Sequence, residues 1–198
     1  VHEGMTLKPL TDYSRFKAEC ERILMEYQSD SFTTVTIRPA TVCGYSRRQR
    51  LDVVVNILTN LAYHKREITI FGGEQLRPNI HIRDMVESYI TLLEAPKDIV
   101  AGEIYNAGYE NQSVSELAQT VRDVMGDDIA LTVTPTDDNR SYHISSEKFR
   151  QQVGFVAKKT IRDAVIDLKS AFDCGKLPNS LTDKRYFNIR LMQSIDLT

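Results

Sequence analysis

Segments with helical periodicity alternate with short β-branched runs along this chain, and this alternation limits the folds open to it. Residues 11–27 place their apolar side chains at helical spacing and predict a helix. Residues 32–37 alternate with β-branched side chains and predict a strand, which we expect Arg38 and Pro39 to end. Because helices and strands follow one another in this way, we expect an α/β fold.

The alternation continues through most of the chain. Helical patterns cover residues 51–63, 83–93, 113–125, 145–153 and 160–171, and strand patterns cover residues 67–71, 79–82, 102–106 and 129–134. We expect the first helix to begin at Thr11 or Asp12 and a later helix to take Asp84 as its N-cap. The S-x-x-E sequence at 113–116 is a capping box. The last segment, 176–198, shows no clear period and is interpreted as a tail.

Composition excludes several kinds of protein. The 198 residues are 41% hydrophobic and 26% charged with a net charge of −2, so we expect no binding to nucleic acid or to an anionic membrane surface. No apolar run approaches the ~18 residues of a membrane span. Cys20, Cys43 and Cys174 show no metal-ligand spacing, and no metal site is expected. With no signal-peptide pattern at the start, these features favour reduced thiols in a cytoplasmic protein.

Tyr13 and Lys17 stand four residues apart in the first predicted helix. Residues with this spacing share one face of a helix. A cationic Lys17 beside the Tyr13 phenol would favour the phenolate, and such a tyrosine can accept a proton from a substrate hydroxyl. An isolated Y-x-x-x-K is more often an ordinary solvent-facing pair, so the weight of this motif depends on the sequence that follows it.

The motifs that follow occur in a recognisable order. After the Tyr-Lys helix come the strand with R-P-A-T-V-C-G at 38–44, a basic loop, an apolar helix, and G-G-E-Q-L-R-P-N-I-H-I-R-D at 72–84. This order resembles the second half of the extended short-chain dehydrogenase/reductases, specifically the NAD-dependent nucleotide-sugar epimerases and dehydratases. The resemblance extends over about residues 9–170.

The resemblance implies a particular part of that fold. It implies the C-terminal part of a Rossmann-like doubly wound sheet in residues 1–45, and a small substrate-binding α/β subdomain mixed with the last Rossmann elements in residues 46–175. No Gly-x-x-Gly-x-x-Gly turn occurs in the chain, although a dinucleotide needs such a turn for its pyrophosphate. We therefore expect the N-terminal cofactor-binding half to be absent and this truncated chain alone to be inactive.

Functional residues follow from the resemblance position by position. The catalytic pair would be Tyr13 and Lys17, which would also bind the cofactor together with Pro39 and Ala40. Five residues would contact the substrate, namely Thr41, Asn56, Arg77, Arg140 and Tyr142. Several positions depart from the family pattern: Phe16 replaces a small residue, Thr41 replaces Asn, Cys43 replaces Tyr, Tyr45 replaces Pro and Pro78 replaces Asp.

Some of these sequence features have plain structural interpretations. Cys43 is interpreted as a buried strand residue and His81 as a packed one, because nothing in the sequence supports a reactive thiolate or a lone histidine base. The three arginines of 46–50 form either a solvated loop or a phosphate-binding segment, since guanidinium groups suit diphosphates.

The implied function is an NAD-dependent epimerase or dehydratase that acts on a nucleotide-diphosphate sugar through a 4-keto intermediate. NADP is an open alternative, and so is the choice between epimerase, dehydratase and reductase. A reductase of a non-sugar substrate and a non-catalytic binding relative are the rival interpretations. A missing half would leave a sheet edge and an apolar face bare, so a homodimer or another form of self-association is expected.

Overall fold

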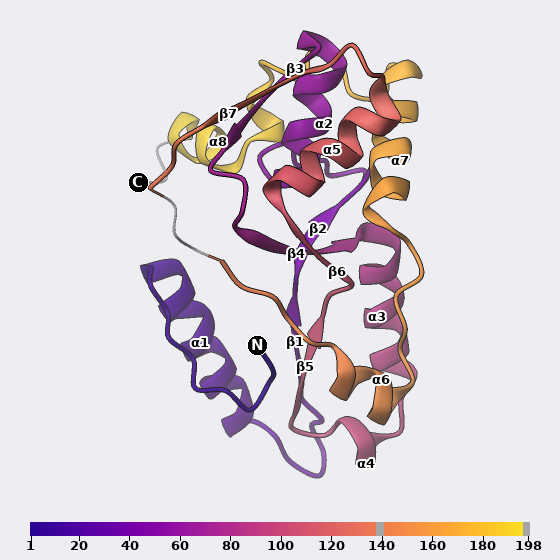
Figure 1. Ribbon diagram of the computed structural model, residues 1–198. Coiled ribbons are helices and arrows are strands. Elements are labelled where there is room, and N and C mark those ends of the chain that lie inside the picture. Colours follow the sequence, from indigo (N-terminus) through magenta and orange to yellow (C-terminus); the bar gives the residue numbers. More distant parts are fainter. Residues whose placement is uncertain (138–140, 196–198) are drawn as a thin grey trace.

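The computed structural model describes residues 1–137 and 141–195, and it confirms the predicted α/β class. Helices and strands alternate along the chain (Figure 1). In order they are α1 (Asp12–Glu26), β1 (Val35–Pro39), β2 (Thr41–Cys43), α2 (Val54–Lys65), β3 (Glu67–Phe71), β4 (Leu76–His81), α3 (Ile82–Glu94), α4 (Lys97–Val100), β5 (Glu103–Ala107), β6 (Glu110–Ser113), α5 (Val114–Met125), β7 (Ala130–Thr134), α6 (Glu147–Val153), α7 (Ile161–Asp173), the 3-10 helix η1 (Lys184–Tyr186) and α8 (Asn188–Ser194).

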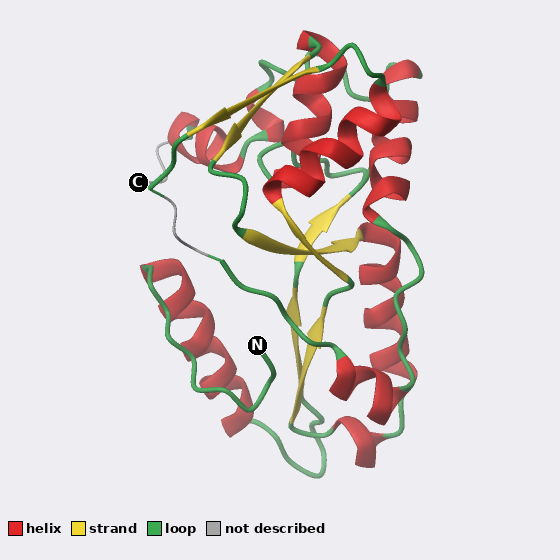
Figure 2. Ribbon diagram, in the orientation of Figure 1, coloured by secondary structure: helices red, strands yellow, loops and turns green. Residues whose placement is uncertain are grey.

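The strands form three small sheets within the described residues (Figure 2). The parallel pair β1–β5 runs in register from Val35 opposite Glu103 to Pro39 opposite Ala107. The second sheet has the order β2-β4-β6, in which β2 and β4 are parallel and β6 is antiparallel. The third is the parallel pair β3–β7. Parallel neighbours joined through helices are the arrangement that the alternating sequence predicts.

One hydrophobic core lies behind the β1–β5 pair. Helices α3, α4 and α6 cover one side of this pair, whereas α1 stands alone on the other side (Figure 1). The core is built around Tyr105, Phe149 and Phe155, whose rings stack at centroid distances of 5.1 Å and 4.7 Å. Ile80 from β4 and Leu92 from α3 complete its centre. Aromatic stacking of this kind adds to the stabilisation that burial alone provides.

A second core lies between α2, α5, α7 and β3. Its fully buried side chains include Ile68, Leu117 and Val165, one from each of three packed elements. The tail adds a third cluster, in which Leu177 and Phe187 pack against Leu168 of α7. Because the residues of the two main cores interleave along the chain, a domain division at residue 45 stays a prediction.

The predicted helices largely agree with the structure because their apolar faces and caps are both present. Thr11 caps α1 and forms a capping box with Ser14, and the predicted S-x-x-E box caps α5. Helix α5 ends at Met125 as predicted, and Gly154 ends α6 in the left-handed conformation at φ 81°. In a sequence, residues whose side chains can cap the backbone mark the start of a helix, and glycine marks its end.

The expected ending of the first strand is wrong. Strand β1 continues through Pro39, which pairs with Ala107, and it begins only at Val35. The Ala40 N–H donates to the Ala107 carbonyl at 2.7 Å, so the missing N–H of Pro39 faces the other side, which is the open edge of β1. Proline is tolerated in a strand at such an edge because no ladder bond is lost.

Three further expectations differ from the structure. The N-cap of α3 is His81, not Asp84, which lies within the first turn. The tail is not irregular, because it contains η1 and α8. The sequence patterns also missed β2, β6 and α4, which are three or four residues long and have no readable apolar period.

Candidate functional site

The predicted catalytic pair lines a groove between α1 and β1. Tyr13 lies in the first turn of α1 and Lys17 in the second, and both side chains are exposed. The groove has a volume of about 520 Å³, and it is also lined by further residues of α1, by strand β1 and by Tyr89 of α3. Pro39, which we expected on the cofactor side, belongs to the same lining. The structure therefore brings Tyr13, Lys17 and Pro39 to one concave surface.

A single ion pair fastens α1 to β1. The Arg38 guanidinium of β1 contacts the Glu21 carboxylate of α1, with its Nη2 at 2.6 Å and its Nε at 2.9 Å. Both side chains are 20% exposed, and Arg38 also donates to the Glu3 carbonyl at 3.3 Å. No residue of α1 is buried. The position of the Tyr13–Lys17 helix therefore depends strongly on this bidentate pair, a geometry that is stronger than a single ionic contact.

The other cofactor-side and substrate residues follow β1 into β2. Ala40 is buried, and its N–H is held by β5. Thr41 begins β2 and pairs with Asn79 of β4. In a parallel sheet, ligands bind beyond the carboxyl ends of the strands, and β1 ends here. Thr41 therefore lies beyond the carboxyl end of β1, two residues after Pro39 of the groove lining.

Arg77 lies on β4 and is half-buried, opposite Gln112 of β6. Its Nη1 donates to the Leu76 carbonyl at 3.1 Å. The segment that begins at Ser141 runs alongside, because the Leu76 N–H donates to Ser141 Oγ at 3.0 Å and the Tyr142 N–H reaches the Leu76 carbonyl at 3.5 Å. The structure thus brings Arg77 and Tyr142, predicted from separate motifs, to neighbouring backbone. Arg140 lies outside the described residues.

Asn56, which we expected among the substrate residues, is buried in this structure. It is 3% exposed, its Oδ1 accepts the Gly44 N–H at 3.0 Å, and its Nδ2 donates to the Arg50 carbonyl at 2.8 Å. Both polar atoms are bonded to the backbone of the loop that follows β2. Asn56 therefore shapes this loop, a role that depends on the fold and not on the local sequence.

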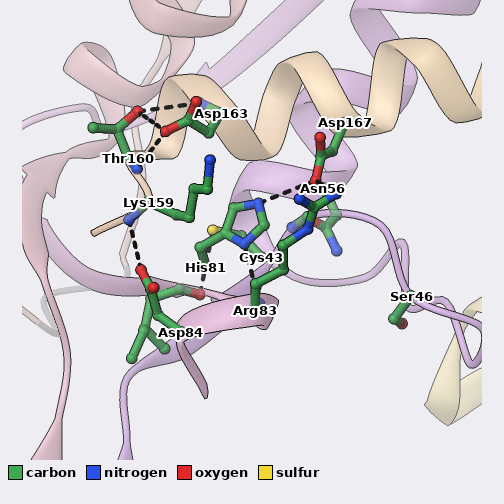
Figure 3. A network of polar contacts seen from close by, with 12 residues as sticks. Cys43, Ser46, Asn56, His81, Arg83, Asp84, Lys159, Thr160, Asp163 and Asp167 are labelled. Carbon is green, nitrogen blue, oxygen red and sulfur yellow. Dashed lines mark hydrogen bonds and ion pairs between the residues drawn. The ribbon is translucent and has the colours of Figure 1, made fainter. Parts of the chain in front are cut away.

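A buried polar network joins β4 and α3 to α7 (Figure 3). The His81 Nδ1 accepts the Arg83 N–H at 3.1 Å, which leaves the proton on Nε2 and directs it toward Asp167 Oδ2 at 3.4 Å. Burial lowers the pKa of His81, and the nearby Asp167 carboxylate partly opposes that shift. The interpretation of His81 as a packed residue is confirmed, and its capping role adds the reason for its orientation.

Asp84 belongs to the same network. Its Oδ2 accepts the backbone N–H groups of Lys158 at 3.0 Å and of Lys159 at 2.7 Å. These two residues precede α7, so Asp84 holds the connection between the two cores. The sequence could not reveal this role, because the partners lie more than 70 positions away along the chain.

Cys43 is buried next to this network, and burial raises the pKa of its thiol to about 12. Its Sγ donates to the Ile80 carbonyl at 3.4 Å. A thiol with so high a pKa stays protonated and unreactive near neutral pH. The structural interpretation of Cys43 is therefore confirmed.

The described part of the chain contains neither a metal-binding cluster nor a membrane-spanning helix. No group of three or more histidine, cysteine or acidic side chains is arranged to hold a metal ion there. Among the same residues, every helix is too short or too polar to cross a membrane.

The fold is similar to those of several solved enzymes. The dTDP-glucose 4,6-dehydratase from Bacillus anthracis in complex with NAD gives a TM-score of 0.77 at 18% identity and covers 91% of this chain and 58% of that chain. UDP-glucose 4-epimerase from Thermotoga maritima with UDP-glucose gives 0.76 at 21%, with 88% and 57% covered. UDP-glucuronic acid 4-epimerase from Bacillus cereus, in complex with UDP-glucuronic acid and NAD, gives 0.76 at 21%, with 88% and 56% covered.

These likenesses confirm the predicted Rossmann-like fold, and the chain spans less than two thirds of the length of each solved structure. Independently, the profile of the NAD dependent epimerase/dehydratase family matches residues 2–108, which is more than half of the 198 residues. The matched region contains the Tyr13–Lys17 helix and the β4 segment with Arg77. The chain therefore belongs to the NAD-dependent epimerase/dehydratase family.

Proposed function

We propose that residues 1–198 provide the proton-transfer and substrate-binding part of an NAD(P)-dependent nucleotide-sugar epimerase or dehydratase. The observation that carries this proposal is the groove in which Tyr13, Lys17 and Pro39 meet. A phenol and an ammonium on one wall, with an open strand end beside them, suit proton exchange with a hydroxyl group. The family match supports the same assignment.

The groove fits one end of a nicotinamide cofactor. Tyr13 and Lys17 offer a hydroxyl and an ammonium that can bond to ribose hydroxyls, while Pro39 gives an apolar surface for a ring. Thr36, which also lines the groove, has a buried hydroxyl oxygen without a hydrogen-bond partner. The glycine-rich turn for the pyrophosphate is not in this sequence. The residues present therefore fit the nicotinamide-ribose half of NAD or NADP.

Tyr13 would act as the general base. A bound nicotinamide supplies the hydride acceptor, and Tyr13 takes the proton from the sugar hydroxyl that is oxidised. Lys17 lies one turn further along α1, lines the same groove and would bind the cofactor ribose beside Tyr13. The substrate would thereby become a 4-keto sugar, which can be epimerised or dehydrated before the hydride and the Tyr13 proton are both returned.

The substrate's diphosphate would be held at β4. Arg77 is half-buried there, and Tyr142 lies on adjacent backbone. A planar guanidinium forms two parallel hydrogen bonds to a phosphate, which positions the sugar as well as binding it. Several solved neighbours are described with UDP-glucose or UDP-glucuronic acid. A nucleotide-diphosphate sugar is therefore the substrate class that we propose.

Two rival functions make different demands on the site. A reductase of a non-sugar substrate needs no phosphate-binding arginine, so the half-buried Arg77 favours the sugar nucleotide. A non-catalytic relative needs neither Tyr13 nor Lys17, yet both line the same groove. We also propose that the protein is a soluble homodimer in the cytoplasm.

The experiment uses a protein that joins residues 1–198 to a cofactor-binding half, assayed with UDP-glucose, UDP-glucuronate and dTDP-glucose. Tyr13→Phe is expected to lower turnover by about two orders of magnitude or more and to leave nucleotide-sugar binding nearly unchanged. Tyr27→Phe, at the other end of the same helix and also exposed, is the matched control and should retain turnover. Turnover near that of the parent in Tyr13→Phe would remove Tyr13 from the mechanism.

A further inference from the structure

The loop of residues 46–50 lies beside the C-terminal tail, because Arg48 contacts Asn188 of α8. A cavity of about 450 Å³ separates loop and tail, and its walls carry Arg47, Arg48, Lys176, Arg185 and the ring of Tyr186. It shares no lining residue with the groove between α1 and β1. The function proposed above uses none of these side chains.

The frame of this cavity is held in place by buried hydrogen bonds. Gln49 is 3% exposed, its Oε1 accepts the Ser46 N–H at 2.9 Å, and its Nε2 donates to the Arg50 carbonyl at 2.9 Å. The Leu51 N–H donates to the Tyr186 carbonyl at 2.9 Å and so joins the loop to the tail. A ligand that enters the cavity would meet an ordered frame, which reduces the entropy cost of binding.

Three of the four cations in the cavity walls form no ion pair with another described residue. Arg185 is paired with Asp183, but the lining itself contains no carboxylate. In the part of the chain that the structure describes, neither Arg47 nor Lys176 forms an ion pair, and Arg48 donates to an amide oxygen at 3.5 Å. Positive charge therefore gathers at one cavity in a chain whose net charge is −2. A cluster of positive charges raises the local concentration of anions.

We propose that this cavity is a binding site for a multiply charged phosphate anion, either a free diphosphate or the diphosphate of a nucleotide. Two unpaired guanidinium groups supply planar hydrogen-bond donors, and Lys176 adds a third cation from the opposite segment. The Tyr186 ring in the wall gives a nucleotide base a surface on which to stack. The volume is large enough for either ligand.

The test is calorimetric titration of inorganic pyrophosphate into the 198-residue chain. We expect saturable binding that weakens as sodium chloride is raised, because exposed charges are screened. The double variant Arg47→Gln with Lys176→Gln should weaken binding by about tenfold or more. Arg150→Gln is the matched control: Arg150 is exposed on α6 and paired with Glu147, and its replacement should leave binding unchanged.

Two further arms identify the ligand and separate this site from the proposed substrate site. UDP that binds more tightly than pyrophosphate, with the same sensitivity to the double variant, indicates a nucleotide; equal affinities indicate a free diphosphate. Loss of pyrophosphate binding in Arg77→Ala, with full binding in the double variant, would place the anion at β4 and overturn the inference. Absence of saturable binding would also overturn it, while leaving the proposed function to the Tyr13→Phe assay.

Discussion

Single side chains in this protein owe their roles to partners that are distant in sequence. His81 is an example, because it caps α3 through Nδ1 and faces Asp167 of α7 through Nε2. Arg77 is another, because the chain returns to β4 through Ser141. Local sequence identified both residues as noteworthy, but only the fold shows what they contact.

Arg77 should act on substrate binding more than on chemistry. The diphosphate of the proposed substrate would not change charge during hydride transfer, so a contact with Arg77 would stabilise the ground state and the transition state alike. A charge-assisted hydrogen bond contributes about 1.5–3 kcal/mol. Arg77→Ala in a protein that includes the cofactor-binding half should therefore raise KM for the sugar nucleotide by roughly one to two decades with a smaller change in kcat. Arg77→Lys should recover part of the loss. Unchanged KM in Arg77→Ala would favour the reductase alternative.

His81 should make the protein less stable as the pH falls. Burial lowers the pKa of His81 in the folded state, so the unfolded chain, with a histidine pKa of about 6.5, binds the proton more readily. The stabilisation that neutral His81 gives the folded state is therefore complete above about pH 6.5. Below that pH the free energy of unfolding falls by up to about 1.4 kcal/mol per pH unit.

Urea denaturation at pH 7, 6 and 5 measures this effect. His81→Asn keeps an N-cap acceptor but cannot titrate, so its free energy of unfolding should fall less steeply between pH 7 and 5 than that of the parent. Exposed His2→Asn is the control and should follow the parent, including the share of the slope that His64 adds through its own lowered pKa. Parallel curves for His81→Asn and the parent would exclude His81 as a source of the pH dependence.

Elements were predictable to the extent that their signals are local. The end of α5 at Met125 could be read from an apolar face and a following glycine, and its start from the S-x-x-E box. Strand β6 has no such signal, because its sequence Glu-Asn-Gln-Ser contains no apolar residue and its pairing with β4 decides its conformation. Pro39 shows the same limit, since only the sheet order reveals that its missing N–H faces an open edge.

The candidate site divides in the same way. Tyr13 and Lys17 could be recognised from their spacing together with the order of the motifs that follow, and the fold places both in one groove. The burial of Asn56 could not be recognised, because it depends on the loop turning back at Gly44. Sequence reasoning thus identifies residues with distinctive chemistry more reliably than it assigns contacts.

Helix α1 should open more readily than any other long helix. None of its residues is buried, and the Arg38–Glu21 pair is its main tie to β1. Regions with few buried contacts exchange their amide hydrogens through low-energy local opening. We therefore expect α1 amides to exchange before those of α5 and α7, which carry buried apolar faces.

Glu21→Gln tests the tie directly. Loss of the ion pair, whose partners are each 20% exposed, should cost about 1 kcal/mol of local stability and speed exchange in α1 several-fold, with α5 unaffected. Glu19→Gln is the matched control, because Glu19 pairs with Arg22 inside the same helix and not with β1. If the α1 amides exchange at the same rate in both variants, the Arg38–Glu21 pair does not hold the helix against β1.

The cofactor site proposed for the molecule would lack a glycine-rich phosphate turn in this sequence. Residues 1–198 contain the groove between α1 and β1 but no Gly-x-x-Gly-x-x-Gly sequence. Because the pyrophosphate contributes much of the affinity for a dinucleotide through backbone N–H groups, we expect the 198-residue chain to bind NADH weakly. Titration of NADH fluorescence measures this affinity, and a low-micromolar Kd would contradict the expectation.

The exposed apolar surface of the whole molecule predicts self-association. Tyr13 and Phe16 of α1 are 73% and 70% exposed, and Leu93 of α3 is 84% exposed. These helices flank β1, which pairs only with β5 among the described strands and so presents an open edge. An open strand edge between apolar walls favours pairing with a second copy.

Sedimentation velocity at concentrations from one to one hundred micromolar tests this prediction. We expect the sedimentation coefficient to rise with concentration from that of a 22.6 kDa monomer toward that of a dimer. Leu93→Lys should shift the equilibrium toward the monomer, because it places a charge on the apolar face of α3. Ile166→Lys, on the half-exposed face of α7, is the matched control and should associate like the parent. A compact monomer at every concentration would show that the open edge and its apolar walls are tolerated in water without a partner.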